Sequence, residues 1–290
     1  MIFALLLPGG NAFSLDRYGP HSVDYSDVSD FVVMGRPVNI QGLTGLLITN
    51  SAYTRAAGEV AIGLSASLED SSDPNYSIVL GALTATIGLT DRFEVGLKGK
   101  MVATNVGSDT TREVGQGDTD VLLKWRISSQ GDTLPAFALG FAYTFPTGDS
   151  TKGFNEVEQQ GIKLMLIATS ENKILDDSFI GVYFEGQAVY NDQIHRVGAV
   201  AKEEAYGVIN AGLLFPISDD NRVQLGLEYN KVFKKDIVTL NEGNYTAFTP
   251  SLRYAGDIFY AQAGVQFLSV DTTSPPRADK RLIGSLGLIF

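Results

Sequence analysis

The chain has 290 residues, of which 44% are hydrophobic and 19% charged, and its formal net charge is -11. This length and apolar content suit one large folded domain and argue against disorder. The negative charge argues against nucleic acid as a partner, because phosphate binding requires clustered Lys and Arg. No apolar run reaches the ~18 residues of a membrane-spanning helix. The absence of Cys excludes disulfides and thiolate chemistry.

The first 57 residues predict two segments that precede the main domain. Residues 1–14 contain an apolar run followed by small residues, which is typical of a secretory signal peptide cleaved after Ser14, although a positive n-region is missing. A buried apolar strand is the alternative. Residues 15–57 show no sustained alternation, so we expect an irregular periplasmic leader, or a small plug built on the more apolar residues 38–49.

From residue 58 onwards, apolar side chains recur at every second position, which is the period of a strand with one apolar face. Such rows begin at residues 60, 79, 93, 119, 137, 162, 180, 209, 223, 248, 259 and 282. The final row ends on Phe290 and resembles the closing strand of bacterial outer-membrane barrels. We therefore predict an all-β fold for residues 58–290, a transmembrane antiparallel up-and-down β-barrel of about 12 strands.

The connections between these rows alternate in length. Residues 104–116, 146–158, 191–203, 233–243 and 271–279 form long connections, whereas 90–92, 216–221 and 255–257 are short. Short periplasmic turns and longer extracellular loops are typical of bacterial barrels, and a soluble sandwich has no reason to show this asymmetry.

Charged side chains within the rows lie on the face opposite the apolar one. Because a lysine or arginine facing lipid near the midplane costs ~2–4 kcal/mol, we expect these charges to face the lumen. The predicted lumen-lining or solute-path residues are Glu94, Lys98, Lys100, Asp118, Asp120, Lys124, Arg126, Lys163, Tyr183, Glu185, Tyr206, Arg222, Glu228, Arg253 and Tyr260. Their charges have both signs, so we expect pairing across neighbouring strands and no strong ion selectivity. The tyrosines either form an aromatic passage or fill space in the barrel.

Two sets of motifs resemble known families. The segments 88–97 (GLTDRFEVGL), 117–126 (GDTDVLLKWR) and 145–149 (FPTGD) resemble the outer-membrane family named for the MetA pathway of phenol degradation. This resemblance implies a channel or transporter barrel for small, sometimes aromatic, organic molecules. Residues 42–49 (GLTGLLIT), followed by Ala52 and Gly58, are similar to the opening of barrels associated with exopolysaccharide export, with Asn50 where that pattern has Pro.

These observations together predict a Gram-negative outer-membrane channel or transporter for small aromatic or amphipathic organic solutes, in contact with membrane lipid and lipopolysaccharide. The alternative is an occluded barrel that serves as a structural element or an export partner of a polysaccharide or protein assembly. The only histidines are His21 and His195, and no Ser stands next to His195. We therefore expect no enzyme, no cofactor and no metal; an outer-membrane enzyme is the weaker alternative. The sequence leaves the solute and the oligomeric state open.

Overall fold

The computed structural model describes residues 35–70, 76–106, 113–131, 133–152, 154, 157, 159–175, 178–192, 204–218, 220–234, 245–270 and 280–290. In this part of the chain, strands β1 to β12 follow one another around a closed antiparallel barrel. The strands are β1 (Val60–Asp70), β2 (Tyr76–Thr90), β3 (Phe93–Val106), β4 (Glu113–Ser128), β5 (Ala136–Phe145), β6 (Gly161–Leu175), β7 (Ser178–Asn191), β8 (Glu204–Pro216), β9 (Val223–Lys234), β10 (Tyr245–Ala255), β11 (Phe259–Val270) and β12 (Lys280–Ile289).

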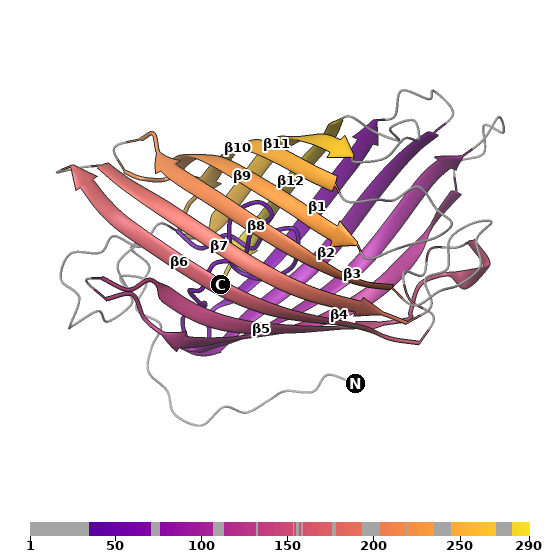
Figure 1. Cartoon of the computed structure of the whole chain (residues 1–290), viewed down its shortest axis with the longest axis horizontal. Helices are drawn as coiled ribbons and strands as arrows, with labels where there is room; N and C mark the ends of the chain where they lie inside the picture. Colours follow the sequence, from indigo (N-terminus) through magenta and orange to yellow (C-terminus); the bar gives the residue numbers. More distant parts are fainter. Residues whose placement is uncertain are drawn as a thin grey trace.

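The barrel closes where β12 pairs with β1, in a register that places Leu286 opposite Leu64. Each strand is tilted, and its neighbours in the sequence are also its neighbours in the sheet (Figure 1). Closure leaves no open sheet edge, which is the condition for a β structure to span a bilayer. The predicted number of strands and the up-and-down order are confirmed.

The two faces of the wall differ as the sequence predicts. Side chains on the outer face remain exposed although they are apolar, as for Leu64 (56%), Leu164 (56%) and Leu286 (51%). Inward positions alternate with them, and the charged Glu94 and Lys124 are fully buried there. An apolar belt of this size is stable against lipid and not against water. Among the residues described, no helix is long and apolar enough to cross a membrane.

The connections follow the predicted asymmetry in part, because 71–75 is short although it lies at the end of the long connections, and 129–135 at the other end is longer than 71–75. Strand ends are joined by the short connections 91–92, 176–177 and 256–258 at one end, and by 146–160, 192–203, 235–244 and 271–279 at the other. The first end is therefore the periplasmic one. The long connection expected at 104–116 is wrong, because β3 continues to Val106 and β4 begins at Glu113. The short helix η2 (Ser150–Lys152) lies in the connection 146–160.

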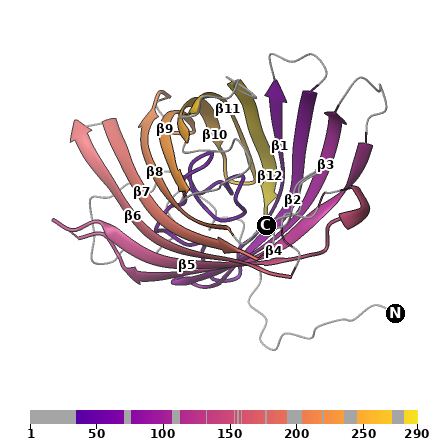
Figure 2. The same cartoon turned by 45° about the vertical axis from the view of Figure 1, so that its right-hand side comes forward.

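Residues 35–57, here named the inner segment, lie inside the barrel (Figures 1 and 2). The segment is irregular: its isolated β-bridges join Val38 to Thr44 and Gly45 to Asn50. Its apolar side chains pack against the inner wall in three clusters, the smallest of which joins Val38 to Ala61 and Tyr260. The largest cluster contains Leu43, Ala52, Tyr53, Leu122, Met165 and Ile167, and another contains Leu46, Phe179, Tyr183 and Leu214.

Candidate functional site in the lumen

Irregular backbone at membrane depth must find hydrogen-bond partners inside the protein, because water does not reach it freely. Glu228 of β9 supplies such partners to the inner segment. Its carboxylate accepts hydrogen bonds from the backbone N–H groups of Leu47 (3.1 Å), Ile48 (3.0 Å) and Thr49 (2.7 Å). Bonds to an ionised acceptor are about twice as strong as neutral ones. One buried carboxylate thus fixes three consecutive residues of the segment.

Glu94 of β3 and Lys124 of β4 form a second anchor. They stand directly opposite each other across the two strands, with both side chains at 0% exposure and 3.1 Å between the charged atoms. Glu94 also accepts from the backbone N–H groups of Thr44 and Arg55, each at 2.9 Å. Lys124 donates to the hydroxyl of Thr44. The two charges of the pair compensate each other. The pair also holds the inner segment at Thr44 and at Arg55.

Glu185 of β7 and Arg253 of β10 are the remaining charged wall residues that bind the inner segment. Glu185 accepts from the backbone N–H of Asn50 at 3.1 Å and from its side-chain amide at 2.6 Å. Arg253 donates to the carbonyl of Gly45 at 3.0 Å and to that of Gly35. Acids therefore bind the N–H groups of the segment, and bases bind its carbonyl groups.

Three glycines on the inner wall provide the room for this docking. A Cβ at Gly212 would lie 2.3 Å from the Leu46 side chain, and one at Gly264 would lie 2.9 Å from that of Leu47. A Cβ at Gly96 would lie 2.4 Å from the carbonyl oxygen of Gly42. The wall is thus shaped for the inner segment as well as bonded to it.

Between the inner segment and the extracellular end lies a cavity of about 410 Å³, here named the chamber. Ile40, Gln41 and Ile48 of the inner segment form its floor. Its charged lining residues, among those described, are Lys98, Lys100, Asp120, Lys163 and Arg281. Tyr206 and Tyr245 also line it.

A row of side-chain amides connects the chamber wall to the inner segment. Arg281 donates to the side chain of Gln266 at 3.3 Å, and Gln266 donates to that of Asn230 at 3.2 Å. Asn230 in turn donates to Asn210 at 2.8 Å, and Asn210 donates to the carboxylate of Glu185 at 2.9 Å. The row crosses β12, β11, β9, β8 and β7. Because Glu185 is an acceptor only, each amide can use its N–H group towards it and its oxygen towards the chamber side.

The predicted lumen residues therefore occupy different environments. Glu94, Lys124, Glu185, Glu228 and Arg253 face inward but contact the inner segment, so they do not line an open path. The expected pairing of opposite charges on neighbouring strands is present in Glu94 with Lys124 and in Lys100 with Asp120, at 3.0 Å. Lys98, Lys100, Asp120, Lys163 and Tyr206 line the chamber.

Four further predicted residues are interior but serve local packing. Asp118 accepts from the backbone N–H groups of Gly148 (2.8 Å) and Val157 (2.9 Å) and so holds the connection 146–160. Arg126 donates to the carbonyl of Asp91 at 2.7 Å. Tyr183 donates to Glu171 at 2.8 Å. Tyr260 covers Gly63 and Gly287, where a Cβ would meet its hydroxyl oxygen at 2.2 and 2.4 Å. Tyr183 and Tyr260 thus fill space.

Arg222 is a correction to the predicted lumen set. It lies in the turn between β8 and β9, and its guanidinium pairs with Asp257 of the next turn at 2.9 Å. Asp220 in the same turn accepts from Ser218 and from the backbone N–H of Arg222, and these bonds lower the pKa of Asp220. Arg222 therefore joins two periplasmic turns and does not line the lumen.

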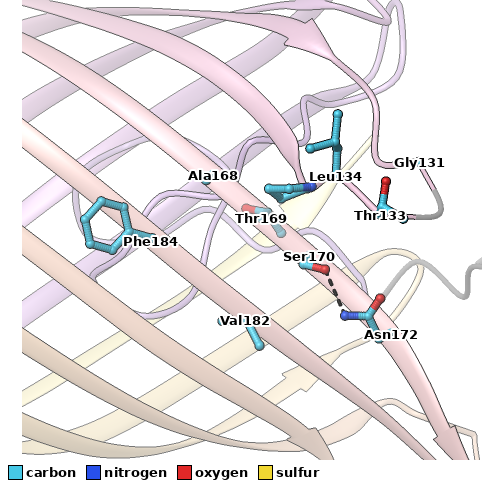
Figure 3. A pocket seen from close by; sticks show the side chains of 10 residues that line it. Gly131, Thr133, Leu134, Ala168, Thr169, Ser170, Asn172, Val182 and Phe184 are labelled. Atoms are coloured by element: carbon cyan, nitrogen blue, oxygen red, sulfur yellow. Dashed lines mark hydrogen bonds between the residues drawn. The ribbon is translucent and has the colours of Figure 1, made fainter.

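A second hollow, of about 370 Å³, lies beside the first residues of β5 (Figure 3). Val182 and Phe184 of β7 line it together with Ser170 and Asn172 of β6, which are joined by a 2.8 Å hydrogen bond. Here β6 runs past its pairing with β5, which ends at Ala136 opposite Thr169. Gln130 replaces the missing strand: its amide donates to the carbonyl of Glu171 at 2.9 Å and accepts from the Glu171 N–H at 2.7 Å.

Sequence reasoning missed the residues through which the inner segment organises itself. Asn39 accepts from the backbone N–H groups of Gln41 and Gly42 and donates to Asn50 at 2.8 Å. The wall residues Thr169 and Gln262 also bind the segment, at Ala52 and Val38. One signal was present in the sequence: glycines at inward positions leave room for chain inside the barrel.

Comparisons with known proteins show which solved structures share this fold. No protein-family model matches the chain, and no curated protein matches it. Among solved structures, an outer membrane channel from Pseudomonas putida F1 has a TM-score of 0.58 at 14% identity, covering 82% of this chain and 98% of that one. The KdgM porin has a TM-score of 0.50 at 11% identity, covering 79% and 99%. The NanC porin has a TM-score of 0.50 at 8% identity, covering 79% and 98%.

The closed barrel, its apolar outer belt and these likenesses define the class of protein. The chain forms a 12-stranded transmembrane β-barrel of the bacterial outer membrane. Identities this low show the fold alone.

Proposed function

We propose that the protein is an outer-membrane channel for small organic solutes and that the inner segment closes it on the periplasmic side. The chamber carries this proposal. It has the size of a small-molecule site, since such sites measure about 300–1,000 Å³, and its floor consists of residues of the inner segment. A solute that enters from outside would reach the chamber and then meet the segment.

The bonds that hold the inner segment suit a closure that can open. The segment has little regular structure of its own, and it is fixed mainly by side chains of the wall acting on its backbone. Each of these bonds depends on one wall side chain, so substitution of that side chain weakens the closure without changing the strand pairings. None of the twelve strand pairings that close the barrel includes a residue of the segment.

The solutes we propose are small and aromatic or amphipathic. This follows from the resemblance of residues 88–97, 117–126 and 145–149 to the MetA-pathway family, whose barrels are associated with such molecules. Several residues of these motifs meet in space: Asp91 accepts from the Ala57 N–H at 3.1 Å, Glu94 pairs with Lys124, and Asp118 binds Gly148. The motifs therefore coincide with the anchors of the inner segment and of the connection 146–160, which supports a shared architecture.

Conductance in planar lipid bilayers tests the proposal. Glu228→Gln replaces a charged acceptor of three N–H groups by a neutral one, and the loss of about 1.5–3 kcal/mol should raise the ratio of open to closed channel by about 10- to 100-fold. Deletion of residues 35–57 should give a permanently open channel. Glu113→Gln is the matched control, because Glu113 is exposed at the start of β4.

Two results would count against the channel. If the deletion variant folds but neither conducts nor lets small solutes swell liposomes, the proposal is wrong. If only the deletion variant conducts, and wild type and Glu228→Gln stay closed, the occluded barrel of a structural or export assembly is the better function. We propose no enzymatic activity; His21 and His195 both lie outside the described residues.

A further inference from the structure

The hollow of about 370 Å³ beside the first residues of β5, here named the outer hollow, opens on the face of the wall that meets lipid (Figure 3). Val182 and Phe184 in its lining are exposed and belong to the apolar outer belt. Leu134, which is also exposed, lines it from the connection 129–135. Because this connection joins periplasmic strand ends, the outer hollow lies where the belt reaches the periplasmic surface of the membrane.

The outer hollow exists because neighbouring strands differ in length. β5 begins at Ala136, whereas β6 continues to Leu175, so the wall lacks one strand beside the last residues of β6. Gln130 takes the place of the missing strand at Glu171 with two hydrogen bonds. The space outside this repair is continuous with the apolar belt, and acyl chains cover an apolar belt of a membrane barrel.

Two polar side chains of β6 stand among the apolar residues of the outer hollow. Ser170 and Asn172 pair with Val182 and Ile180 of β7. The Asn172 amide donates one N–H to the Ser170 hydroxyl oxygen at 2.8 Å, and its carbonyl oxygen accepts from Gln130 at 3.2 Å. These bonds use one of the two amide N–H groups and leave the hydroxyl O–H to donate elsewhere. Donors that face lipid need an acceptor, because water is scarce there.

The phosphate of a phospholipid is the acceptor that this place in the membrane offers. It carries ionised oxygen atoms next to acyl chains, and hydrogen bonds to an ionised acceptor are about twice as strong as neutral ones. The described lining of the outer hollow contains no charged side chain, so neutral donors make the polar contacts. Ser170 and Asn172 supply the donors, and the apolar side chains beside them supply the surface for a chain.

We propose that the outer hollow binds one glycerophospholipid of the periplasmic leaflet. Its phosphate accepts hydrogen bonds from Ser170 and Asn172, and one acyl chain packs on Leu134, Val182 and Phe184. This site is separate from the chamber, and its occupation requires no conduction, so it stands or falls apart from the channel function.

Native mass spectrometry of the purified full-length protein, released from detergent with added phosphatidylethanolamine, tests the site. We expect one lipid to be retained, and diacylglycerol with the same chains to bind at least about tenfold more weakly, because it lacks the charged acceptor. Val182→Trp fills the hollow and should lower the affinity for phosphatidylethanolamine by about tenfold or more. Val265→Trp is the matched control, because Val265 of β11 is exposed on the same outer face and lines neither the outer hollow nor the chamber.

Ser170→Ala is a milder variant that removes one donor and keeps the shape of the hollow, so it carries the test if Val182→Trp does not fold. It should weaken the binding of phosphatidylethanolamine by about tenfold and leave that of diacylglycerol unchanged. Asn172 is kept, because its carbonyl oxygen also binds Gln130 of the wall.

Equal binding of phosphatidylethanolamine and diacylglycerol would overturn the proposal. So would a Val182→Trp variant that retains the lipid as well as Val265→Trp does while its circular dichroism shows an intact barrel. An unchanged affinity in Ser170→Ala would remove the proposed phosphate contact. Lipid A serves as a third probe with phosphate groups: if it displaced phosphatidylethanolamine at equal concentration, the site would be one for lipopolysaccharide and the proposal would be wrong.

Discussion

At the scale of single residues, the interior depends on charges that have exchanged water for protein partners. Removing one member of a buried ion pair is far more costly than the pair is worth, because the other charge stays buried without compensation. Glu94 and Lys124 are such a pair, 3.1 Å apart and fully buried. Their replacement therefore tests how strongly the folded chain depends on this buried pair.

Glu94→Gln should lower the free energy of unfolding by about 3–5 kcal/mol, because Lys124 then lacks its counter-ion. Lys124→Met in the same chain should restore part of this loss, since the unpaired charge is gone. Denaturant unfolding in detergent measures both changes. If the double variant is as unstable as Glu94→Gln alone, the buried lysine is not the cause of the loss.

A second residue-scale prediction concerns the space left by Gly212. An added Cβ lies 2.3 Å from Leu46, so Gly212→Ala should displace that part of the inner segment and increase backbone amide exchange at residues 46–50. Gly186→Ala is the control for the added methyl group, because a Cβ at Gly186, between the inward-facing Glu185 and Gln187, has no atom within 4 Å. Equal exchange in the two variants would show that the segment is not seated against Gly212.

At the scale of elements, the start of β5 is a weak point that a side chain stabilises. Past Ala136, β6 has no strand on that side, and an unpaired backbone group at such a place costs about 1–3 kcal/mol. The Gln130 amide reproduces the missing strand by making both a donor and an acceptor bond with Glu171. Its fit depends on the connection between β4 and β5, which positions Gln130.

Gln130→Ala should therefore destabilise the barrel by about 1–3 kcal/mol and increase amide exchange at Glu171 first. Gln159→Ala removes the same side chain at an exposed site and should change neither quantity. Exchange followed by mass spectrometry, together with thermal unfolding, measures the effect. An unchanged exchange rate at Glu171 would mean that water replaces the amide without cost.

At the scale of the whole molecule, the sequence predicts the wall well and its contents poorly. The rows that begin at residues 60 to 282 predict every strand of the wall and the face of its leucines, because lipid and lumen impose a strict period of two. The inner segment imposes no such period. The wall acids bind its backbone N–H groups, which every residue except proline has. The identity of the residues therefore does not predict that Glu228 binds Leu47, Ile48 and Thr49. For the same reason, Glu94 and Lys98 look alike in sequence although only Lys98 lines the chamber.

The final prediction concerns the proposed movement of the inner segment out of the lumen. An engineered disulfide can test it, because the chain has no native Cys. A Cβ at Gly35 would lie 2.7 Å from that of Ala255, about 1 Å nearer than the mean separation in disulfides. Gly35 begins the described part of the inner segment, so a small shift there should let Gly35→Cys and Ala255→Cys form a bond. This bond and β1 would then hold both ends of the segment to the wall.

If solutes pass only when the segment leaves the lumen, the oxidised double variant should stay closed in planar bilayers, and a reductant should restore the openings of wild type. The single variants, which cannot form the bond, should conduct alike with and without reductant. Openings of equal frequency in the oxidised and reduced double variant would mean that the solute path does not require the segment to leave, and the closure proposed for residues 35–57 would have to be abandoned.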